Sequence, residues 1–303
     1  SYGERLSATL VSRLLQSRGL PGVLADARRC IITTSDHTRA TPLLGPTGES
    51  TRDHLGPLLA DELVPVLGGF IASAMSGAAT TLGRGGSDYT AALIGAALDA
   101  REIQIWTDVT GFLTADPRLV PQARPIAHLS YAEAAELAYF GARVLHPKTI
   151  QPAVERGIPV RVCNSRHPLE PGTLIDDDPV VTPGGVKAIA HKSGATVVQV
   201  SSARMLGAYG FLKALFEIFD RHRTAVDVVS TSEVSVSLTL EDTHALTEIV
   251  ADLEELGTVT VESGWAIVCI VGEGLRSTRG VAARVFGTLE DVDVAVISQG
   301  ASI

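Results

Sequence analysis

The chain has 303 residues, which is more than one ordinary hydrophobic core holds, so two domains are expected. Hydrophobic residues make up 45% and charged residues 19%, a composition typical of globular proteins that excludes a disordered chain. The net charge of −9 argues against nucleic-acid and anionic-membrane partners, and no apolar run approaches the roughly 20 residues that span a bilayer.

Cysteine and histidine usage indicates a reducing compartment and no transition-metal site. Cys30, Cys163 and Cys269 lie far apart in apolar runs, which predicts buried thiols and a cytoplasmic protein. The eight histidines show no metal-ligand spacing. The chain begins at Ser1 without a methionine or a signal peptide and stops at Ile303 in an expected strand pair, so both ends are predicted to be cut.

Leucines at helical spacing predict a helix over residues 5–18, followed by a short buried strand over residues 22–27. Glu4 lies just before this helix, where a carboxylate ordinarily compensates the helix dipole. Residues 35–54 are rich in proline, glycine and polar side chains and predict a loop with little regular structure. An apolar run over residues 64–72 then predicts a buried strand.

A glycine-rich loop, TTLGRGGSDYT, occupies residues 80–90. Its glycines let backbone N–H groups approach a ligand, and a helix beginning near Ser87 would direct its N–H groups and positive dipole end to the same space. Arg84 adds a guanidinium that fits a carboxylate or a phosphate, while Asp88 suits a helix cap or a cationic amine. The pattern favours an anion-binding site over a plain glycine-rich turn.

Residues 102–108 predict a strand whose carboxyl end carries Thr107 and Asp108. Ligands of open α/β sheets gather at the carboxyl ends of strands, so these two side chains are well placed for a nucleotide. The loop that follows, residues 109–118, ends in Asp-Pro-Arg and brings the cation of Arg118 to the same region.

Helices and strands continue to alternate up to residue 175. Ser130 and Glu133 form a capping box that predicts a helix over residues 130–140. A further helix over residues 148–156 and strands over residues 158–163 and 173–175 complete this part. The alternation predicts an α/β domain over residues 1–178, with a mostly parallel sheet and helices on both faces. The Pro- and Gly-containing residues 179–186, which follow the run Asp176-Asp177-Asp178, predict a linker.

The second part, residues 187–303, repeats itself. Glycine and phenylalanine recur at the same spacing in residues 210–216 and 280–286, and each copy continues into a β-rich run, residues 226–229 and 292–296. Further strands are predicted over residues 196–201, 234–240, 258–261 and 266–271, with a helix over residues 244–256. This βαββαβ order predicts two copies of one small α+β module.

Four stretches together resemble the aspartate kinases of the amino-acid-kinase superfamily. They are TTLGRGGSDYTA (80–91), IWTDVTGFLTADPR (105–118), LSYAEAAELAYFGARVLHP (129–147) and TSEVSVSLTL (231–240). The resemblance covers nearly the whole chain and implies a catalytic domain followed by tandem ACT domains, which sense amino acids. It implies a first ACT domain, about 204–264, inserted in a second, about 187–203 plus 265–303, with the strand near 196–201 in the second copy.

The resemblance implies ATP-dependent phosphorylation of the β-carboxylate of L-aspartate, with Mg²⁺ carried by ATP rather than by a protein metal site. The implied aspartate-binding residues are Glu4, Phe70, Arg84, Gly85, Gly86, Ser87 and Asp88. The implied ATP-binding residues are Thr107, Asp108, Arg118 and Arg143. Arg84, Asp88 and Arg143 are the implied catalytic residues.

The chain departs from the family in three places. Arg143 stands where lysine is usual, and Leu113 stands where a tyrosine is common. The family also opens with a Lys-Phe-Gly-Gly-Thr-Ser segment whose lysine contacts the transferring phosphate, and no such segment is present. Residues 1–303 alone are therefore expected to turn over substrate at a negligible rate.

The resemblance also implies an effector site between an ACT copy and a neighbouring subunit. Its residues are Met205, Gly210, Phe211, Leu212, Val226, Asp227, Thr231, Ser232 and Glu233. Backbone N–H groups at 210–212 suit the effector's carboxylate, and Asp227 and Glu233 suit its ammonium groups. Two carboxylates favour lysine over threonine, and the shared site implies a homodimer or homotetramer formed through the ACT domains. A module that only dimerises is the structural alternative.

Three other functions fit the sequence less well. Another kinase of the superfamily is disfavoured by the ACT-like repeat and the 80–90 loop. A non-catalytic ACT sensor subunit does not account for residues 84–88. A nicotinamide-dependent oxidoreductase would need G-x-G-x-x-G directly after the first strand and an acidic residue about 20 positions later, and the sequence has neither.

Overall fold

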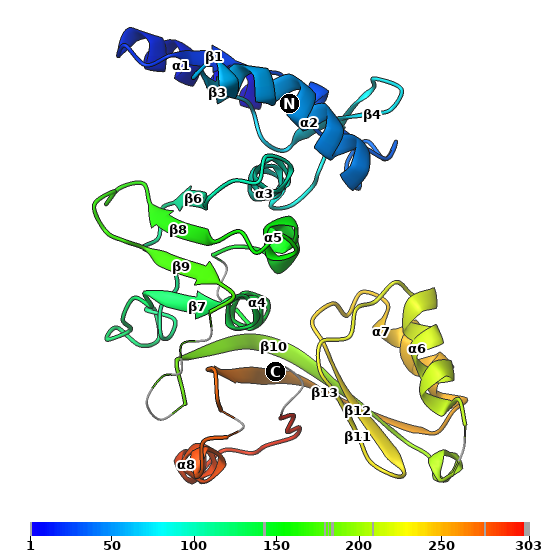
Figure 1. The fold of residues 1–303 in the computed structure, drawn as a ribbon. Coiled ribbons are helices and arrows are strands. Elements are labelled where there is room, and N and C mark those ends of the chain that lie inside the picture. The colour runs from blue at the N-terminus through cyan, green and yellow to red at the C-terminus, as the bar shows by residue number, and fades with distance from the viewer. Residues whose placement is uncertain are drawn as a thin grey trace. The chain divides into compact units, whose positions relative to one another are not determined.

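The computed structural model describes residues 2–141, 144–178, 180, 182, 185–207, 209–275 and 277–299. The chain divides into two compact units, Ser1–Val181 and Thr182–Ile303, whose elements are drawn in Figure 1. Within the described residues, no helix is both long and apolar enough to cross a membrane.

The first unit alternates helices and strands. Its helices are α1 (Tyr2–Ser17), the 3-10 helix η1 (Ala27–Arg29), α2 (Leu44–Ala60), α3 (Gly86–Ala97), α4 (Tyr131–Tyr139) and α5 (Pro147–Val154). Its strands are β1 (Gly22–Leu24), β2 (Ile32–Thr33), β3 (Val64–Val66), β4 (Ile71–Ala74), β5 (Ala79–Thr81), β6 (Ile103–Thr107), β7 (His128–Ser130), β8 (Val160–Asn164) and β9 (Thr173–Asp176). They form sheets in the orders β1-β3, β2-β4-β5 and β6-β8-β9-β7.

Parallel pairing dominates these sheets. β1 pairs with β3, β2 with β4, β6 with β8 and β7 with β9 in parallel, whereas β4–β5 and β8–β9 are antiparallel. Figure 1 shows α3, α5 and α4 in a row along one side of the β6-β8-β9-β7 sheet. A core between α2, α3 and the β2-β4-β5 sheet contains the buried residues Cys30, Ile31, Leu55, Ala72, Leu82 and Leu93. The predicted α/β class is confirmed.

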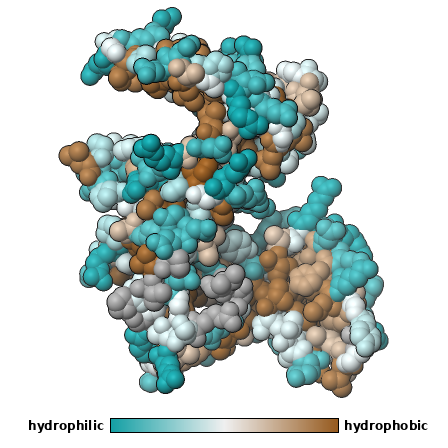
Figure 2. All heavy atoms as spheres, in the orientation of Figure 1, coloured by the Kyte–Doolittle hydropathy of each residue, from teal (hydrophilic) through white to brown (hydrophobic). Residues whose placement is uncertain are grey.

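Helix α1 has an apolar face that no described residue covers. Its buried positions are Ala8 and Ser12, while Leu6, Leu10 and Leu14 are exposed. Figure 2 shows hydrophobic side chains at the surface of this part of the first unit. The leucine spacing therefore predicted the helix correctly, although these leucines do not form its buried side.

The expectation of an irregular loop over residues 35–54 is wrong, because α2 begins at Leu44. Pro46 lies in the first helical turn, where its missing N–H would have no helical partner. Thr47 and Thr51 are fully buried, and the Thr47 hydroxyl bonds both backbone groups of Ile32 at 3.0 and 3.1 Å. The polar residues that suggested a loop thus form the packed face of a helix.

The single strand expected over residues 64–72 is also wrong. It is divided into β3 and β4, which belong to different sheets. The break lies at Phe70, whose φ of 71° is in the left-handed region that side chains other than glycine rarely adopt. This turn points residues 68–70 toward the start of α3.

The second unit consists of an antiparallel sheet in the order β11-β12-β10-β13 and its helices. The elements are β10 (Ala188–Ser201), η2 (Ala203–Met205), α6 (Phe211–Arg221), β11 (Val229–Thr231), β12 (Ser235–Leu240), α7 (Leu246–Glu254), β13 (Thr258–Val271) and α8 (Val281–Thr288). Alternate strand residues pack with α6 and α7 in one core, which contains Val198, Val200, Val236, Leu238, Leu215, Phe219, Ile249 and Leu253. Residues 196–263 therefore complete a βαββαβ module.

Strand pairing corrects three details of the expected repeat. Residues 196–201 pair with β12, so they belong with the first copy and not with the second. The strands predicted at 258–261 and 266–271 are one strand, because Gly264, at φ +88°, lies in a bulge that keeps β13 continuous. Residues 292–296 were expected to be β-rich but form no strand.

Candidate functional site

Three segments that are distant in sequence bring most of the predicted aspartate-binding residues together. Glu4 lies in the first turn of α1, and a Cβ on Gly68 would lie 2.9 Å from the Cβ of Glu4. A Cβ on Gly69 would lie 3.0 Å from the Cα of Ser87. Glycine is needed at both positions because the backbone of residues 68–69 runs directly against α1 and the start of α3.

Phe70 is fixed against the same helix start by a relay of hydrogen bonds. Its N–H donates to Thr90 Oγ1 at 3.0 Å, and that hydroxyl donates to the carbonyl of Gly86 at 2.7 Å. A Cβ on Gly86 would lie 2.8 Å from Phe70 Cδ2. A left-handed residue with a side chain costs about 1–2 kcal/mol, so these contacts hold Phe70 in a conformation it would not adopt alone.

The start of α3 has the electrostatics of an anion site. Its N-cap is Gly85, at φ +69°, and no described side chain caps the helix, so first-turn N–H groups remain for a ligand. The exposed Arg84 lies directly before this cap. Asp88 is half-buried in the first turn, and burial raises its pKa.

The predicted nucleotide residues lie at the carboxyl end of β6. Thr107 ends the strand and Asp108 follows it, exposed. Arg118 lies farther along the loop and holds the Asp116 carboxylate through three side-chain hydrogen bonds, the shortest being 2.7 Å from Nη2 to Oδ2. The Arg118 side chain is 84% exposed. Arg143 lies outside the described residues.

Sequence reasoning missed a second strand end at this place. β8 is the parallel neighbour of β6, and Thr107 is in register with Asn164. The Asn164 side chain donates to Thr110 Oγ1 at 2.9 Å, and Ser165 donates to the Thr107 carbonyl. The available signal was a polar Asn-Ser-Arg turn directly after a predicted strand, the same arrangement that singled out Thr107 and Asp108.

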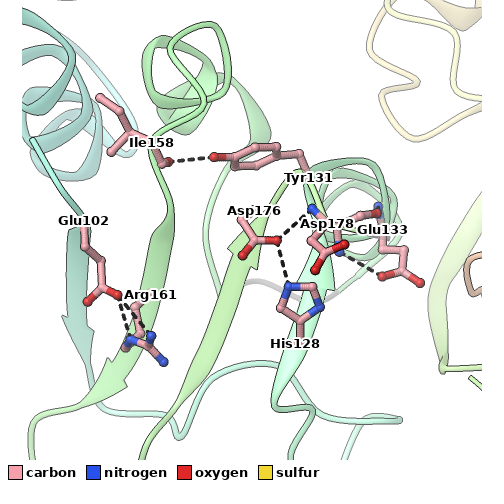
Figure 3. Close-up of polar contacts among 9 residues, drawn as sticks. Glu102, His128, Tyr131, Glu133, Ile158, Arg161, Asp176 and Asp178 are labelled. Carbon is pink, nitrogen blue, oxygen red and sulfur yellow. Dashed lines mark hydrogen bonds and ion pairs between the residues drawn. The ribbon is translucent and has the colours of Figure 1, made fainter. Parts of the chain in front are cut away.

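A further polar cluster fastens the strands of this unit and touches neither predicted site (Figure 3). His128 Nε2 lies 2.7 Å from Asp176 Oδ1, which also accepts the N–H of Asp178. Tyr131 donates its hydroxyl to the carbonyl of Ile158 at 2.7 Å, and burial raises its pKa to about 12. These contacts join β7, β9 and α4 to their neighbours, a structural role.

The predicted capping box at α4 is confirmed. The backbone N–H of Ser130 donates to Glu133 Oε2 at 2.9 Å, and the N–H of Glu133 donates back to Ser130 Oγ at 3.2 Å. Across the described residues, no group of three or more His, Cys, Asp and Glu side chains is placed to hold a metal ion.

The predicted effector residues fall in two groups in the second unit. Met205, Phe211 and Val226 pack against the same hydrophobic core, beside the start of α6, whose N-cap Gly210 has φ +84°. Leu212 lies in the first turn of α6. Thr231 ends β11, and Ser232 and Glu233 follow it in the turn before β12; all three residues are exposed.

Asp227 differs from the other predicted effector ligands because an internal cation holds it. Its Oδ1 lies 3.3 Å from Lys192 Nζ, and only 7% of its side chain is exposed. Lys192 also pairs with Glu241 at 2.8 Å. The ammonium that the sequence led us to expect from an effector is thus matched here by a lysine of β10.

Comparison with known proteins agrees with this arrangement. The amino acid kinase family matches residues 1–164, and an ACT domain matches residues 268–303. Lysine-sensitive aspartokinase 3 of Escherichia coli is 41% identical over 310 residues, which cover 100% of this chain and 69% of that protein. Aspartokinase 3, chloroplastic, of Arabidopsis thaliana is 42% identical over 315 residues, which cover 100% of this chain and 56% of that protein.

Solved structures give the same relationship. The crystal structure of E. coli aspartokinase III with aspartate and ADP superposes with a TM-score of 0.85, over 99% of this chain and 68% of that one. The structure of the same enzyme with lysine and aspartate gives 0.79 over the same shares. The chain therefore belongs to the amino acid kinase family and, within it, to the aspartokinases.

Proposed function

We propose that this chain provides the aspartate- and nucleotide-binding parts of an enzyme that transfers the γ-phosphoryl group of ATP to the β-carboxylate of L-aspartate. The product is 4-phospho-L-aspartate, the first intermediate toward lysine, threonine and methionine. The proposal depends on one observation, the convergence of Glu4, residues 68–70 and residues 85–88. It is supported by the E. coli relative, whose structure contains aspartate and ADP.

The chemistry requires positioning and charge neutralisation. A β-carboxylate oxygen forms a bond to the γ-phosphorus while the bond from that phosphorus to ADP breaks, and no proton has to move. Arg84 and the first-turn N–H groups of α3 receive the carboxylates of aspartate. Glu4 and Asp88 receive its ammonium group, which restores the charged form that burial disfavours at Asp88.

The nucleotide is assigned to the carboxyl ends of β6 and β8, with Thr107, Asp108 and Arg118 as ligands. Mg²⁺ accompanies ATP and is held mainly by phosphate and water oxygens. Arg143 is proposed to offset charge on the γ-phosphoryl group.

A coupled assay of ADP release by the full-length protein tests the activity, because residues 1–303 alone are expected to turn over substrate at a negligible rate. Aspartate should support turnover, whereas glutamate, acetylglutamate and UMP should not. Turnover with one of these and none with aspartate would identify a different kinase of the superfamily. ATP binding without turnover of any of them would contradict the proposed reaction while keeping the nucleotide site.

Lysine is proposed as a feedback inhibitor that binds at residues 205–233 of a homodimer or homotetramer in the cytoplasm. Support comes from the exposed Glu233 turn and from the E. coli relative, which is named lysine-sensitive. Lysine should raise the aspartate concentration needed for half-maximal rate, and sedimentation should give at least a dimer. Inhibition by threonine alone would support the same effector site with threonine as its ligand. No response to either amino acid would mean that the ACT unit has a purely structural role.

A further inference from the structure

The turn after β8 is built to hold the segment that follows β6. The two strands are parallel neighbours, drawn side by side in Figure 1, so their carboxyl ends meet at the same sheet edge. Asn164 ends β8 in register with Thr107, and it is the only asparagine in the chain.

Side-chain and backbone hydrogen bonds brace this turn and connect it to the segment after β6. Asn164 Nδ2 donates to Thr110 Oγ1 at 2.9 Å, and Asn164 Oδ1 accepts the N–H of Arg166 at 2.9 Å. Ser165 donates twice to the Thr107 carbonyl, from its N–H at 2.8 Å and from its hydroxyl at 2.9 Å. The Asn164 amide is thus used at both ends, one end holding its own turn and the other holding the loop.

Because the Asn164 amide is buried, losing one of its hydrogen bonds costs more than losing one at the surface. The Asn164 residue is 5% exposed, and the loss of a partner would leave a desolvated polar group. The loop is anchored again two residues beyond Thr110, where Phe112, fully buried, donates its N–H to Thr173 Oγ1 at 2.8 Å. Between Thr107 and Thr110, Asp108 and Val109 remain exposed to a ligand.

We propose that Asn164 is a positioning residue for nucleotide binding, acting through Thr110. It touches no nucleotide atom in this scheme, but it fixes the path of residues 107–110 so that Thr107 and Asp108 present a preformed surface to ATP. The inference rests on the proposed function, which assigns ATP to this strand end.

A double-mutant cycle in the intact protein tests it. Asn164→Ala and Thr110→Val should each raise the KM for ATP about 10-fold, with kcat and the KM for aspartate nearly unchanged. The double variant should be no worse than either single variant, because both remove the same bond. Gln16→Ala is the matched control, since it removes a side-chain amide that donates to the Gly22 carbonyl far from the loop.

The outcomes separate the inference from the function on which it rests. An unchanged KM for ATP in Thr110→Val, or an additive effect near 100-fold in the double variant, would overturn the role of Asn164. Thr110→Val keeps Asn164 in place and so tests the bond even if Asn164→Ala does not fold. If Asp108→Ala raises the KM for ATP while Thr110→Val does not, the nucleotide site stands and only this inference fails. If the unmodified protein binds no ATP, the proposed function itself fails.

Discussion

Phe70 and Thr90 are joined by a hydrogen bond of 3.0 Å from the Phe70 N–H to the Thr90 hydroxyl, between a left-handed turn and the middle of α3. The same hydroxyl donates to the Gly86 carbonyl at 2.7 Å, so one side chain fixes both the turn and the first turn of the helix. Two hydrogen bonds therefore fix residues 70 and 86, both proposed to bind aspartate, relative to each other.

Thr90→Val should weaken the attachment of Phe70 to the start of α3. Valine keeps the volume but removes the hydroxyl, and the loss leaves buried polar groups without their partner, which costs about 1–3 kcal/mol. We expect a lower free energy of unfolding in a urea titration and a higher KM for aspartate. Thr9→Val is the control, because the Thr9 hydroxyl makes only a local bond on the exposed side of α1. Equal effects of the two substitutions would contradict the special role of Thr90.

Arg84→Ala should abolish efficient use of aspartate. Losing the charged partner of a substrate carboxylate costs on the order of 3 kcal/mol, which corresponds to more than about 100-fold in kcat/KM. The KM for ATP should change little. Arg101→Ala, at an exposed arginine away from the site, provides the comparison in steady-state kinetics. A kcat/KM for aspartate near that of the unmodified protein would show that Arg84 does not bind aspartate.

Asp88 should make the ligand-free protein less stable as pH rises. Burial raises its pKa in the folded state, so at a pH between the unfolded and folded pKa values the folded protein binds more protons than the unfolded chain. Stability therefore falls as pH rises through that window, and the cost persists above it. Asp88→Asn should remove this pH dependence and raise stability at pH 7 while abolishing aspartate turnover. Thermal unfolding from pH 4 to 8 gives the measurement, and a stability profile that Asp88→Asn leaves unchanged would show that burial of this charge is without consequence.

Glu233→Ala should raise the lysine concentration for half-maximal inhibition about 10-fold, because it removes a carboxylate from the exposed turn proposed to hold an effector ammonium. Glu255→Ala, at another exposed glutamate of the second unit, should leave that concentration unchanged. Inhibition curves at fixed aspartate separate the two, and coincident curves would exclude Glu233 as a ligand.

Lys192→Met should destabilise the second unit by about 3–5 kcal/mol, since it removes the ammonium that balances the buried Asp227. The double substitution Lys192→Met with Asp227→Asn should recover part of this loss, because the buried charge is then gone as well. Chemical denaturation of the unmodified protein, of Lys192→Met, of Asp227→Asn and of the double variant measures the coupling. Additive losses in the free energy of unfolding would show that Lys192 and Asp227 have no coupling energy.

The sequence predicted the features that depend on local chemistry. The glycines at 85–86 and the Ser130–Glu133 box act within one turn of their own helices, and both are found where the pattern placed them. Features that depend on distant partners were not predicted. Thr47 is buried because its hydroxyl bonds Ile32 of another element, and Asn164 matters only because β8 lies beside β6. The left-handed Phe70 has no local signal at all, since its conformation is imposed by Thr90 and α3.

The long antiparallel pairing of β10 with β13 affects how the second unit folds during translation. Ala188 pairs with Val271 and Ser201 with Thr258, so β10 is synthesised well before the strand that completes it. Residues 196–201 find a nearer partner in β12, but among the described residues 188–193 pair with β13 alone. That half-strand must wait until its partners, residues 266–271, have emerged and folded back, and closing so large a loop is slow. During synthesis, the strand edge of residues 188–193 therefore stays unpaired until late. We expect a chaperone to bind the second unit there.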